Sequence, residues 1–239
     1  MALPHTVLVT GGALRTGRTI AMRLAQAGAK VILHANKHSA EAQELCGMLP
    51  GEGHIAISGD LSSPDGVENI CRHASGCDGI VLNASLYRHN YSGGDADFDR
   101  QLMEVNCNAQ VRIIDSFAGS PHPEGGAVVA MLDQAISSEE VNPYLESRRA
   151  LWRRMKEFAL LYGKDDLRFN AVLPGPMLPP PELGDTGMVR TLPTLPLGRS
   201  VDLEDAARCV EFLLSCRSIT GTILFADCGQ SVAKRKNVL

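Results

Sequence analysis

Short apolar runs alternate along the chain with longer stretches whose apolar residues recur at helical spacing. The run Val7-Leu8-Val9 is continuously apolar, as in a strand that is covered on both faces of a parallel sheet. In the stretch after it, Ile20, Leu24 and Ala27 recur at i, i+4 and i+7, the spacing of one helix face. The pattern predicts strands over Thr6–Thr10, Lys30–His34, His54–Ser58, Gly79–Asn83, Ala127–Leu132, Arg168–Leu173 and Thr222–Ala226. It predicts helices over Gly17–Ala27, Ala40–Leu49, Pro64–Ala74, Phe98–Ala118, Pro143–Tyr162 and Leu203–Leu214.

This alternation predicts a single α/β domain over residues 1–239, of the doubly wound Rossmann type, whose seven-stranded, mainly parallel sheet carries helices on both faces. Prolines break the rhythm once, because seven of the 13 fall between Pro174 and Pro196. The segment at about residues 174–200 follows the carboxyl end of a predicted strand, where open α/β sheets bind ligands. We predict a substrate loop there, with a solvated linker as the alternative.

Composition narrows the class of protein. With 44% hydrophobic and 21% charged residues, the chain of 239 residues is globular by composition. A net charge of −4 gives no general attraction to nucleic acid or to an anionic membrane, and no run approaches the roughly 18 apolar residues of a membrane span. The seven cysteines are scattered and never spaced as CxxC, which argues for a reducing compartment and against a disulfide framework or a metal site. No secretory signal pattern stands at the N-terminus, so we expect a cytoplasmic protein.

The first predicted strand runs directly into the turn Thr10-Gly11-Gly12-Ala13-Leu14-Arg15-Thr16-Gly17-Arg18 and then into a helix. Glycines permit a tight turn there and let backbone N–H groups approach a pyrophosphate at the helix N-terminus. The position of the turn predicts a dinucleotide site that includes Gly11, Arg15, Thr16 and Gly17. A plain βα turn is the alternative.

The second predicted strand leads into Asn36-Lys37-His38-Ser39, with no acidic residue before Glu41. NAD-binding versions of this fold place an acid here to bind the ribose 2′-hydroxyl, whereas a cation suits the 2′-phosphate of NADP. Arg15 adds a second cation to the same corner, so we predict NADP(H) as the cofactor, bound in part by these four residues. A solvated basic loop is the alternative.

Asp60 and Leu61 follow the third predicted strand and extend the expected cofactor site along the same edge of the sheet. The Asp60 carboxylate could accept a hydrogen bond from an adenine amino group. It could equally serve as a turn or N-cap residue, and the sequence leaves both roles open.

These segments resemble the short-chain dehydrogenase/reductase family over essentially the whole chain, and within it the pteridine reductase and dihydromonapterin reductase branch. The matching motifs are Thr10-Gly-x-x-x-Arg15-x-Gly17, Asn83-Ala84-Ser85, Val105-Asn106, Tyr144-x-x-x-Arg148, Pro174-Gly175, Thr220-Gly221 and Asp227-x-Gly229. Arg15 in the glycine turn, and Ser85 in the place of a more usual glycine, favour the pteridine branch. The resemblance implies hydride transfer between a nicotinamide cofactor and a small substrate.

By this resemblance Tyr144 exchanges a proton with the substrate, and because the pKa of a free Tyr is about 10 it needs help from a cation. Arg148 stands at i+4, where the family has a Lys, and keeps the positive charge on a bulkier, planar group. Asp133 stands where most members have a Ser, and it resembles the Asp with which pteridine reductases help the Tyr; it could also cap a turn. Asn106 matches a helix Asn that anchors a water relay, or is a plain polar helix residue.

The resemblance also implies two sets of binding residues. Further cofactor contacts fall on Asn83, Ala84, Ser85, Tyr144, Arg148, Pro174 and Gly175. Substrate contacts fall on Arg15, Ser85, Tyr87, Asp133 and Tyr144, where Tyr87 would stack on a flat heterocycle or is simply an exposed loop residue. Two functions stay open: an NADPH-dependent reductase of a pterin-like or other small carbonyl or imine substrate, and, because Arg148 replaces the Lys, a catalytically weakened NADP(H)-binding sensor or regulator.

One predicted helix carries five cations in nine residues: Arg148, Arg149, Arg153, Arg154 and Lys156. The negative net charge and the lack of interleaved aromatic residues argue against nucleic acid as a partner. In relatives this helix and the one predicted over Phe98–Ala118 build a dimer face, and the latter carries Asp99, Glu104 and Asp115. We therefore expect a homo-oligomer, a dimer or tetramer, with a solvated helix face as the alternative.

Overall fold

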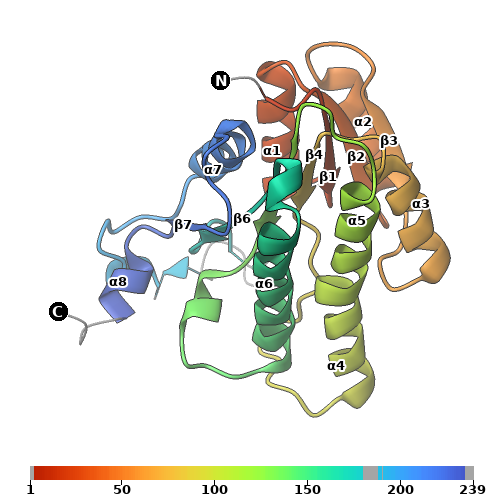
Figure 1. Ribbon diagram of the computed structural model, residues 1–239. Helices are drawn as coiled ribbons and strands as arrows, with labels where there is room; N and C mark the ends of the chain where they lie inside the picture. Colours follow the sequence, from red (N-terminus) through yellow and green to blue (C-terminus); the bar gives the residue numbers. More distant parts are fainter. Residues whose placement is uncertain (1–2, 180–187, 190, 235–239) are drawn as a thin grey trace.

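The protein is described by a computed structural model that places residues 3–179, 188–189 and 191–234. Its centre is one seven-stranded parallel sheet in the order β3-β2-β1-β4-β5-β6-β7 (Figure 1). The strands are β1 (Thr6–Thr10), β2 (Lys30–Ala35), β3 (Ile55–Ser58), β4 (Gly79–Leu82), β5 (Gly126–Met131), β6 (Leu167–Pro174) and β7 (Ile223–Ala226). The predicted doubly wound α/β fold is confirmed, with every strand pairing parallel.

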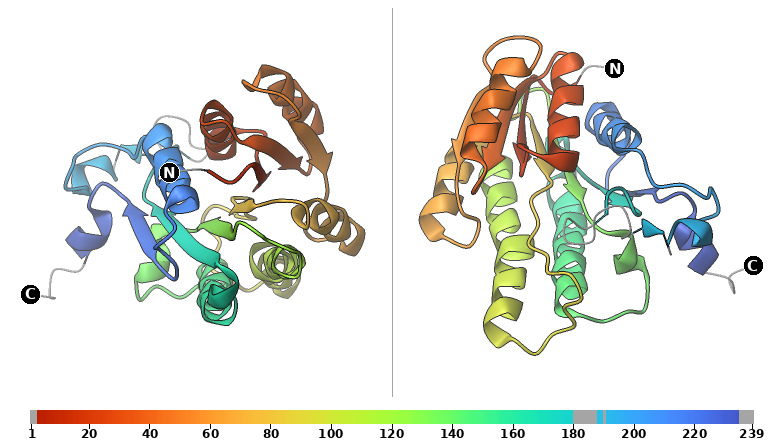
Figure 2. Two further views of the ribbon diagram at one scale, coloured as in Figure 1. Left: turned by 45° about the horizontal axis from the view of Figure 1, so that its top comes forward. Right: turned by 180° about the vertical axis from the view of Figure 1, so that it is seen from behind.

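Helices cover both faces of the sheet, as the two views of Figure 2 show. The α-helices are α1 (Arg15–Gln26), α2 (Ser39–Met48), α3 (Pro64–Ala74), α4 (Ala96–Met103), α5 (Ala109–Ala118), α6 (Pro143–Leu161), α7 (Leu203–Ser215) and α8 (Gln230–Lys234). Val7 and Val9 of β1 belong to the core beneath α1, α2 and α7, whereas Leu8 belongs to the core beneath α3, α5 and α6. Successive strand residues point to opposite faces, so a strand buried on both sides must be apolar throughout.

The helix predicted over Phe98–Ala118 is interrupted, which corrects the sequence prediction. Between α4 and α5 lies a π-helical segment, η1 (Glu104–Asn108), where the N–H of Ala109 donates to the carbonyl of Glu104. A π turn contains one residue more than an α turn and commonly occurs at functional sites. The helical spacing of apolar residues continues on both sides of η1, and therefore gave no sign of the interruption.

The loops that leave the carboxyl ends of the strands gather at one edge of the sheet, which we call the carboxyl edge. The chain reverses direction across the sheet between β1 and β4, because β2 and β3 lie on one side of β1 and β4 to β7 on the other. Open α/β sheets bind ligands at such a switch point. Residues 180–187 and 190 of the Pro-rich segment lie outside the described residues, so the substrate loop at 174–200 stays a prediction. None of the described helices is long and apolar enough to cross a membrane.

Candidate functional site

The turn between β1 and α1 needs glycine for two different steric reasons. Gly11 adopts φ +62°, and a Cβ there would lie 3.1 Å from the Cα of Ala84. Gly17 lies in the first turns of α1, where a Cβ would come within 2.0 Å of the carbonyl oxygen of Gly11. The Asn83 carboxamide, after β4, donates to the carbonyls of Thr10 (3.1 Å) and Gly11 (3.0 Å) and so holds the turn against the sheet. The result is a compact backbone at a helix N-terminus, which suits a pyrophosphate.

His34 at the end of β2 is a site residue that sequence reasoning missed. Its Nδ1 accepts the N–H of Gly11 (3.3 Å), and its Nε2 lies 2.9 Å from the carbonyl oxygen of Gly59. These contacts require the proton on Nε2, so the ring is neutral and joins the β1 turn to the end of β3. Burial lowers the pKa of His34, against the opposing hydrogen bond to Gly59. Its position inside the apolar run Val31-Ile32-Leu33-His34 was the available signal.

A cleft of about 680 Å³ opens beside the turn at the carboxyl edge. It is lined by twelve of the residues predicted to bind cofactor: Gly11, Arg15, Thr16, Gly17, Asn36, Lys37, His38, Asp60, Leu61, Asn83, Ala84 and Ser85. His38 is among them, as are the cations Arg15 and Lys37, while Ser39 begins α2 and does not line the cleft. A glycine cradle with these cations at one end fits the pyrophosphate and 2′-phosphate of NADP(H).

The Asp60 carboxylate closes a turn at the rim of this cleft. Its Oδ1 accepts the backbone N–H (2.8 Å) and the hydroxyl (2.7 Å) of Ser62. These two hydrogen bonds lower the pKa of Asp60, with smaller contributions from Asn36 and Lys37. The turn role that the sequence left open is therefore present, and the adenine contact stays a prediction.

A second cavity, of about 420 Å³, adjoins the cleft and shares Arg15 and Thr16 with it. Its lining also includes Tyr87, Asp133, Tyr144, Pro174 and Gly175. The structure thus brings four of the five predicted substrate residues together in one cavity: Arg15, Tyr87, Asp133 and Tyr144. Ser85 lines the cofactor cleft instead, where its hydroxyl donates to Asn106 Oδ1 at 3.3 Å.

The hydroxyl of Tyr144 donates to Asp133 Oδ2 (3.3 Å) in this second cavity, and we call these two residues the Tyr–Asp pair. Burial raises the pKa of Tyr144 well above its ordinary value, and the negative charge of Asp133 raises it further. Arg148 acts in the opposite direction. The ring of Tyr87 meets that of Tyr144 edge to face, with 5.0 Å between ring centroids. Tyr144 is therefore a neutral phenol that can give up a proton but holds it at neutral pH.

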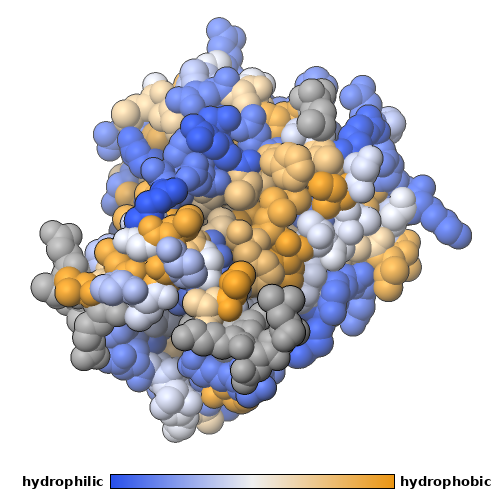
Figure 3. Space-filling view, turned by 90° about the vertical axis from the view of Figure 1, so that its left-hand side faces the viewer, coloured by the Kyte–Doolittle hydropathy of each residue, from blue (hydrophilic) through white to orange (hydrophobic). Residues whose placement is uncertain are grey.

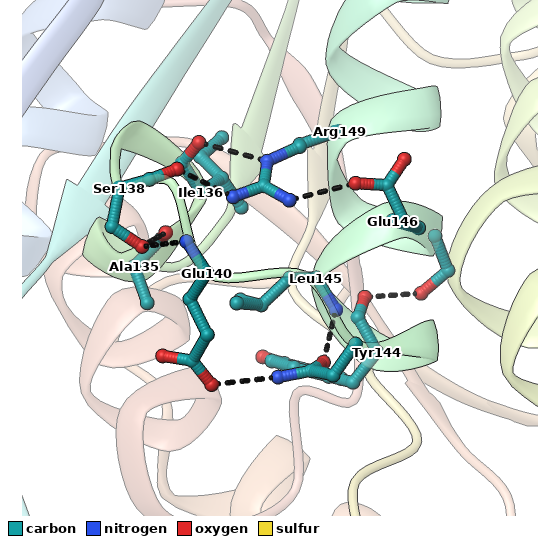
Figure 4. A network of polar contacts seen from close by, with 10 residues as sticks. Ala135, Ile136, Ser138, Glu140, Tyr144, Leu145, Glu146 and Arg149 are labelled. Atoms are coloured by element: carbon teal, nitrogen blue, oxygen red, sulfur yellow. Dashed lines mark hydrogen bonds and ion pairs between the residues drawn. The ribbon is translucent and has the colours of Figure 1, made fainter. Parts of the chain in front are cut away.

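A network of polar contacts fixes the two elements that carry the Tyr–Asp pair (Figure 4). Arg149 of α6 donates to the carbonyls of Ile136 (3.0 Å) and Ser138 (2.7 Å) in the loop after Asp133, and pairs with Glu146 (2.7 Å). Asn142 caps α6 by accepting the N–H of Leu145 (2.9 Å). Because α6 and the Asp133 loop are joined directly, the spacing of the Tyr–Asp pair is built into the fold.

Arg148 lies beneath the pair and lines neither cavity. It is 1% exposed, and its Nη2 donates to the carbonyl of Met131, the last residue of β5. Its Nε and Nη1 have no hydrogen-bond partner among the described residues. Burial lowers the pKa of Arg148, while Tyr144 and Asp133 favour its charged form. Its charge thus acts on the Tyr–Asp pair through the protein interior.

Asn106, in the π segment, is completely buried and also lines neither cavity. Its Oδ1 accepts the N–H of Leu86 (2.7 Å), and its amide donates to the carbonyl of Leu86 (2.9 Å) and to Ser147 Oγ (3.1 Å). The side chain therefore ties the loop after β4 to α6. This loop carries Ser85 and Tyr87, so Asn106 positions it. The predicted water relay stays a prediction.

The cationic helix is less of a surface feature than its sequence indicates. Arg148 is buried, and Arg149 contacts a loop of the same chain. These two of the five cations are therefore occupied by contacts within the chain. Arg154 pairs with Glu157 on the same helix. On the facing segments, Glu104 pairs with Arg112, and Asp99 accepts the hydroxyl of Tyr91 (2.6 Å). Oligomer formation through these charges stays a prediction.

The fold and the site define a dinucleotide-binding α/β oxidoreductase class: a glycine turn at the switch point of a parallel sheet, beside a cavity lined by a half-buried Tyr. Residues 13–231 match the family model described as enoyl-(acyl carrier protein) reductase, and the chain belongs to the short-chain dehydrogenase/reductase family. It is thus an NAD(P)-dependent oxidoreductase by family.

Known proteins similar to this chain differ in their substrates. An L-rhamnose 1-dehydrogenase (NAD(P)(+)) of Sphingomonas sp. (strain SKA58) is 28% identical, with 95% of this chain and 96% of that protein covered. A 3-oxoacyl-[acyl-carrier-protein] reductase FabG of Aggregatibacter actinomycetemcomitans is 26% identical, over 89% of this chain and 92% of that protein. The crystal structure of FolM alternative dihydrofolate reductase 1 from Brucella canis, complexed with NADP, superposes with a TM-score of 0.89 at 28% identity and covers 100% of this chain and 99% of that one. The similarity to FolM alternative dihydrofolate reductase 1 therefore extends over the whole fold.

Proposed function

We propose that this protein is an NADPH-dependent reductase of a pterin-like substrate or another small carbonyl or imine. The observation that carries the proposal is the Tyr–Asp pair in a cavity that adjoins the cofactor cleft through Arg15 and Thr16. A proton donor beside the end of a dinucleotide cleft supports hydride and proton delivery to one substrate. The bound cofactor supplies the hydride, and the residues of this chain supply the proton and the orientation.

The preference for NADP(H) over NAD(H) rests on charge. Arg15, Lys37 and His38 line the cleft, and no acidic residue ends β2. Guanidinium and ammonium groups form charge-assisted hydrogen bonds with a phosphate, whereas a ribose diol is best held by a carboxylate. The Brucella FolM structures, which contain NADP, support the same choice.

Reduction is the direction that the Tyr–Asp pair supports. A general base must lose its proton near the working pH, and the raised pKa of Tyr144 opposes this. A general acid needs only to hold a proton that it can donate as charge develops on the substrate. In the proposed step Tyr144 gives its proton to the substrate atom next to the one that accepts hydride, and Asp133 holds the hydroxyl in place.

A flat substrate is supported by the aromatic wall of the cavity. Tyr87 and Tyr144 meet edge to face, and this arrangement leaves a ring face for stacking a heterocycle. The similar Brucella proteins are alternative dihydrofolate reductases, and they support a pterin ring in particular.

The test is oxidation of NADPH with 7,8-dihydrobiopterin and with dihydrofolate, run beside a panel of small ketones, imines and sugars. We expect turnover of at least one pterin and faster oxidation of NADPH than of NADH. Turnover of ketones, imines or sugars with no pterin reduced would exclude the pterin but keep the reductase function, whereas no turnover of any substrate in the panel would contradict the reductase function. A parallel titration of NADPH by fluorescence separates failure to bind cofactor from failure to react.

Arg148 favours a second candidate function, a weakened NADP(H)-binding sensor or regulator. The cation that the family places next to the Tyr is here enclosed between α6 and β5 and lines neither cavity. NADPH binding without turnover of any panel substrate supports this second function, whereas turnover of any of them at ordinary enzymatic rates excludes it.

A further inference from the structure

The last described helix, α8, was not predicted from the sequence, and it forms part of the wall of the second cavity. Gln230, its first residue, lines this cavity together with Asp133 and Gln134. The helix packs against η2 (Gln134–Ser137), the short 3₁₀ segment that follows Asp133, and the two lie side by side in Figure 1. A residue of the C-terminal segment thus takes part in the site where the substrate is proposed to bind.

The backbone of Gln230 is held firmly by the buried residue Asp227. Asp227 Oδ1 accepts the N–H of Gly229 (3.0 Å), Oδ2 accepts that of Ser231 (2.7 Å), and its main-chain carbonyl accepts that of Gln230 (3.0 Å). A Cβ on Gly175 would lie 2.8 Å from the Cα of Asp227, so the ends of β6 and β7 are in close contact here. Gln230 therefore has a defined position, as a recognition residue requires.

The polar neighbours of Gln230 already have partners, whereas its own carboxamide has none within the part of the chain that the structure describes. Asp133 Oδ1 accepts the N–H of Ala135 (2.8 Å) and Oδ2 accepts the Tyr144 hydroxyl (3.3 Å). The Gln134 amide donates to Ser137 Oγ (3.4 Å). The half-buried Gln230 side chain forms no hydrogen bond with any described residue. A carboxamide offers two donors and an acceptor, and a ligand that fills the cavity and covers this side chain would have to satisfy them, because buried polar groups are seldom left without partners.

We propose that Gln230 is a specificity residue, which hydrogen-bonds the amide–amidine edge of the pterin ring; this rests on the function proposed above. That edge has an N–H donor next to a carbonyl acceptor, the complement of a carboxamide. A simple ketone or aldehyde has no second hydrogen-bonding edge, so Gln230 selects between these two classes of substrate. Rejection of an analogue that leaves a site's polar group unpaired is an established source of discrimination.

The experiment compares Gln230→Leu, Gln230→Glu and the control Val232→Ala, which changes a side chain on the same helix that is 73% exposed. With 7,8-dihydrobiopterin, Gln230→Leu should raise KM about tenfold and leave kcat and the Kd for NADPH unchanged. Gln230→Glu retains acceptors but loses donors and should raise KM as well. Val232→Ala should match the parent. With benzaldehyde, which lacks the second edge, KM should be the same in all four proteins.

Equal KM for 7,8-dihydrobiopterin in the parent and Gln230→Leu would overturn the proposal, as would a parallel rise with benzaldehyde. Calorimetric titration of biopterin into the complex with NADP⁺ separates this inference from the proposed reductase function. Binding by the parent that Gln230→Leu weakens about tenfold supports the specificity role even if no pterin is reduced. No binding of biopterin by the parent overturns it, and turnover of another panel substrate would then show that the enzyme works on a different class.

Discussion

Tyr144 and Asp133 are joined by a hydrogen bond and come from different elements. Tyr144 lies on α6, and Asp133 is the residue that caps η2. We expect Tyr144→Phe to lower kcat by about 100-fold or more, because the substrate loses its proton donor. Asp133→Asn should act in the same direction, because the carboxylate that orients the hydroxyl is lost. NADPH affinity should remain nearly that of the parent in both variants, since neither side chain lines the larger cleft. Steady-state kinetics with a fluorescence titration checks both points, and parental turnover in both variants would show that the pair is not catalytic.

Arg148 is a buried cation whose Nε and Nη1 have no partner among the described residues. Burying an ion costs several kcal/mol, and replacing buried ion pairs with apolar side chains of similar size is often neutral or stabilises a protein by about 1–4 kcal/mol. Arg148→Met should therefore raise the free energy of unfolding, measured by urea titration. It should also lower kcat, because the charge that opposes the rise in the Tyr144 pKa is gone.

Arg148→Lys completes the comparison at this position, because it keeps the charge on a smaller group. We expect turnover to rise, since an ammonium on a flexible stem can approach the cofactor cleft. If Arg148→Lys instead lowers a measurable activity, the arginine is adapted to this site, and the sensor function loses its main support. A loss of stability in Arg148→Met would show that the guanidinium has partners that outweigh its burial.

At the scale of elements, the proposed preference for NADPH rests on two connections, β1–α1 and β2–α2. They contribute Arg15 and, at the end of β2, Lys37 and His38 to one cleft. Replacing both Arg15 and Lys37 with Ala should reduce the preference for NADPH over NADH by a few kcal/mol at most, about the worth of two charge-assisted hydrogen bonds. Titrations with both cofactors measure the change. Equal affinity of the unmodified protein for the two cofactors would contradict the assignment.

The extent to which sequence predicts structure also differs by element. All seven strands and most helix bounds follow from apolar periodicity, because both faces of the sheet are buried. Residues of the cleft were predictable because they follow strand ends within a few positions. The burial of Arg148 was not predictable, because helical spacing gives the direction of a side chain but does not show how completely other elements cover it. His34 and Gln230 were missed for a related reason: one is hidden in an apolar run, and the other depends on contacts between segments far apart in sequence.

At the scale of the whole molecule, pH affects a residue that joins three strands. The ring of His34, neutral in the fold, contacts Gly11 after β1 and Gly59 after β3. Its pKa is lowered by burial, so below the ordinary value near 6.5 the unfolded chain binds a proton that the native protein does not. Stability from this residue is complete above about pH 6.5 and is lost as the pH falls towards the folded-state pKa. NADPH affinity should fall with it, because the protonated ring cannot accept the Gly11 N–H.

Urea titration and NADPH titration between about pH 8 and pH 5 measure both effects. His34→Asn, which cannot titrate in this range, should flatten the pH dependence. His5→Gln is the matched control, because the side chain of His5 is 84% exposed and does not line the cofactor cleft. An unchanged pH dependence in His34→Asn would assign the effect to other groups.

The face of the molecule shown in Figure 3 carries a group of apolar side chains at its centre and others in several places around it. Leu160 and Leu161, at the end of α6, are 87% and 66% exposed. The homo-oligomer that the family resemblance implies remains a proposal, and light scattering of the purified protein tests it directly.

Between α4 and α5 the π segment acts as a phase shift. One additional residue advances the helix by about 100°, so the two halves present their buried faces in directions that a continuous α-helix could not combine. Phe98 and Leu102 belong to one half, and Ile113 and Phe117 to the other. Deleting one residue from the segment would bring the halves back into phase and turn Asn106 away from the loop that it holds. We therefore expect substitutions in this segment to be tolerated far better than insertions or deletions. The number of its residues determines the position of the site as much as the identity of any side chain does.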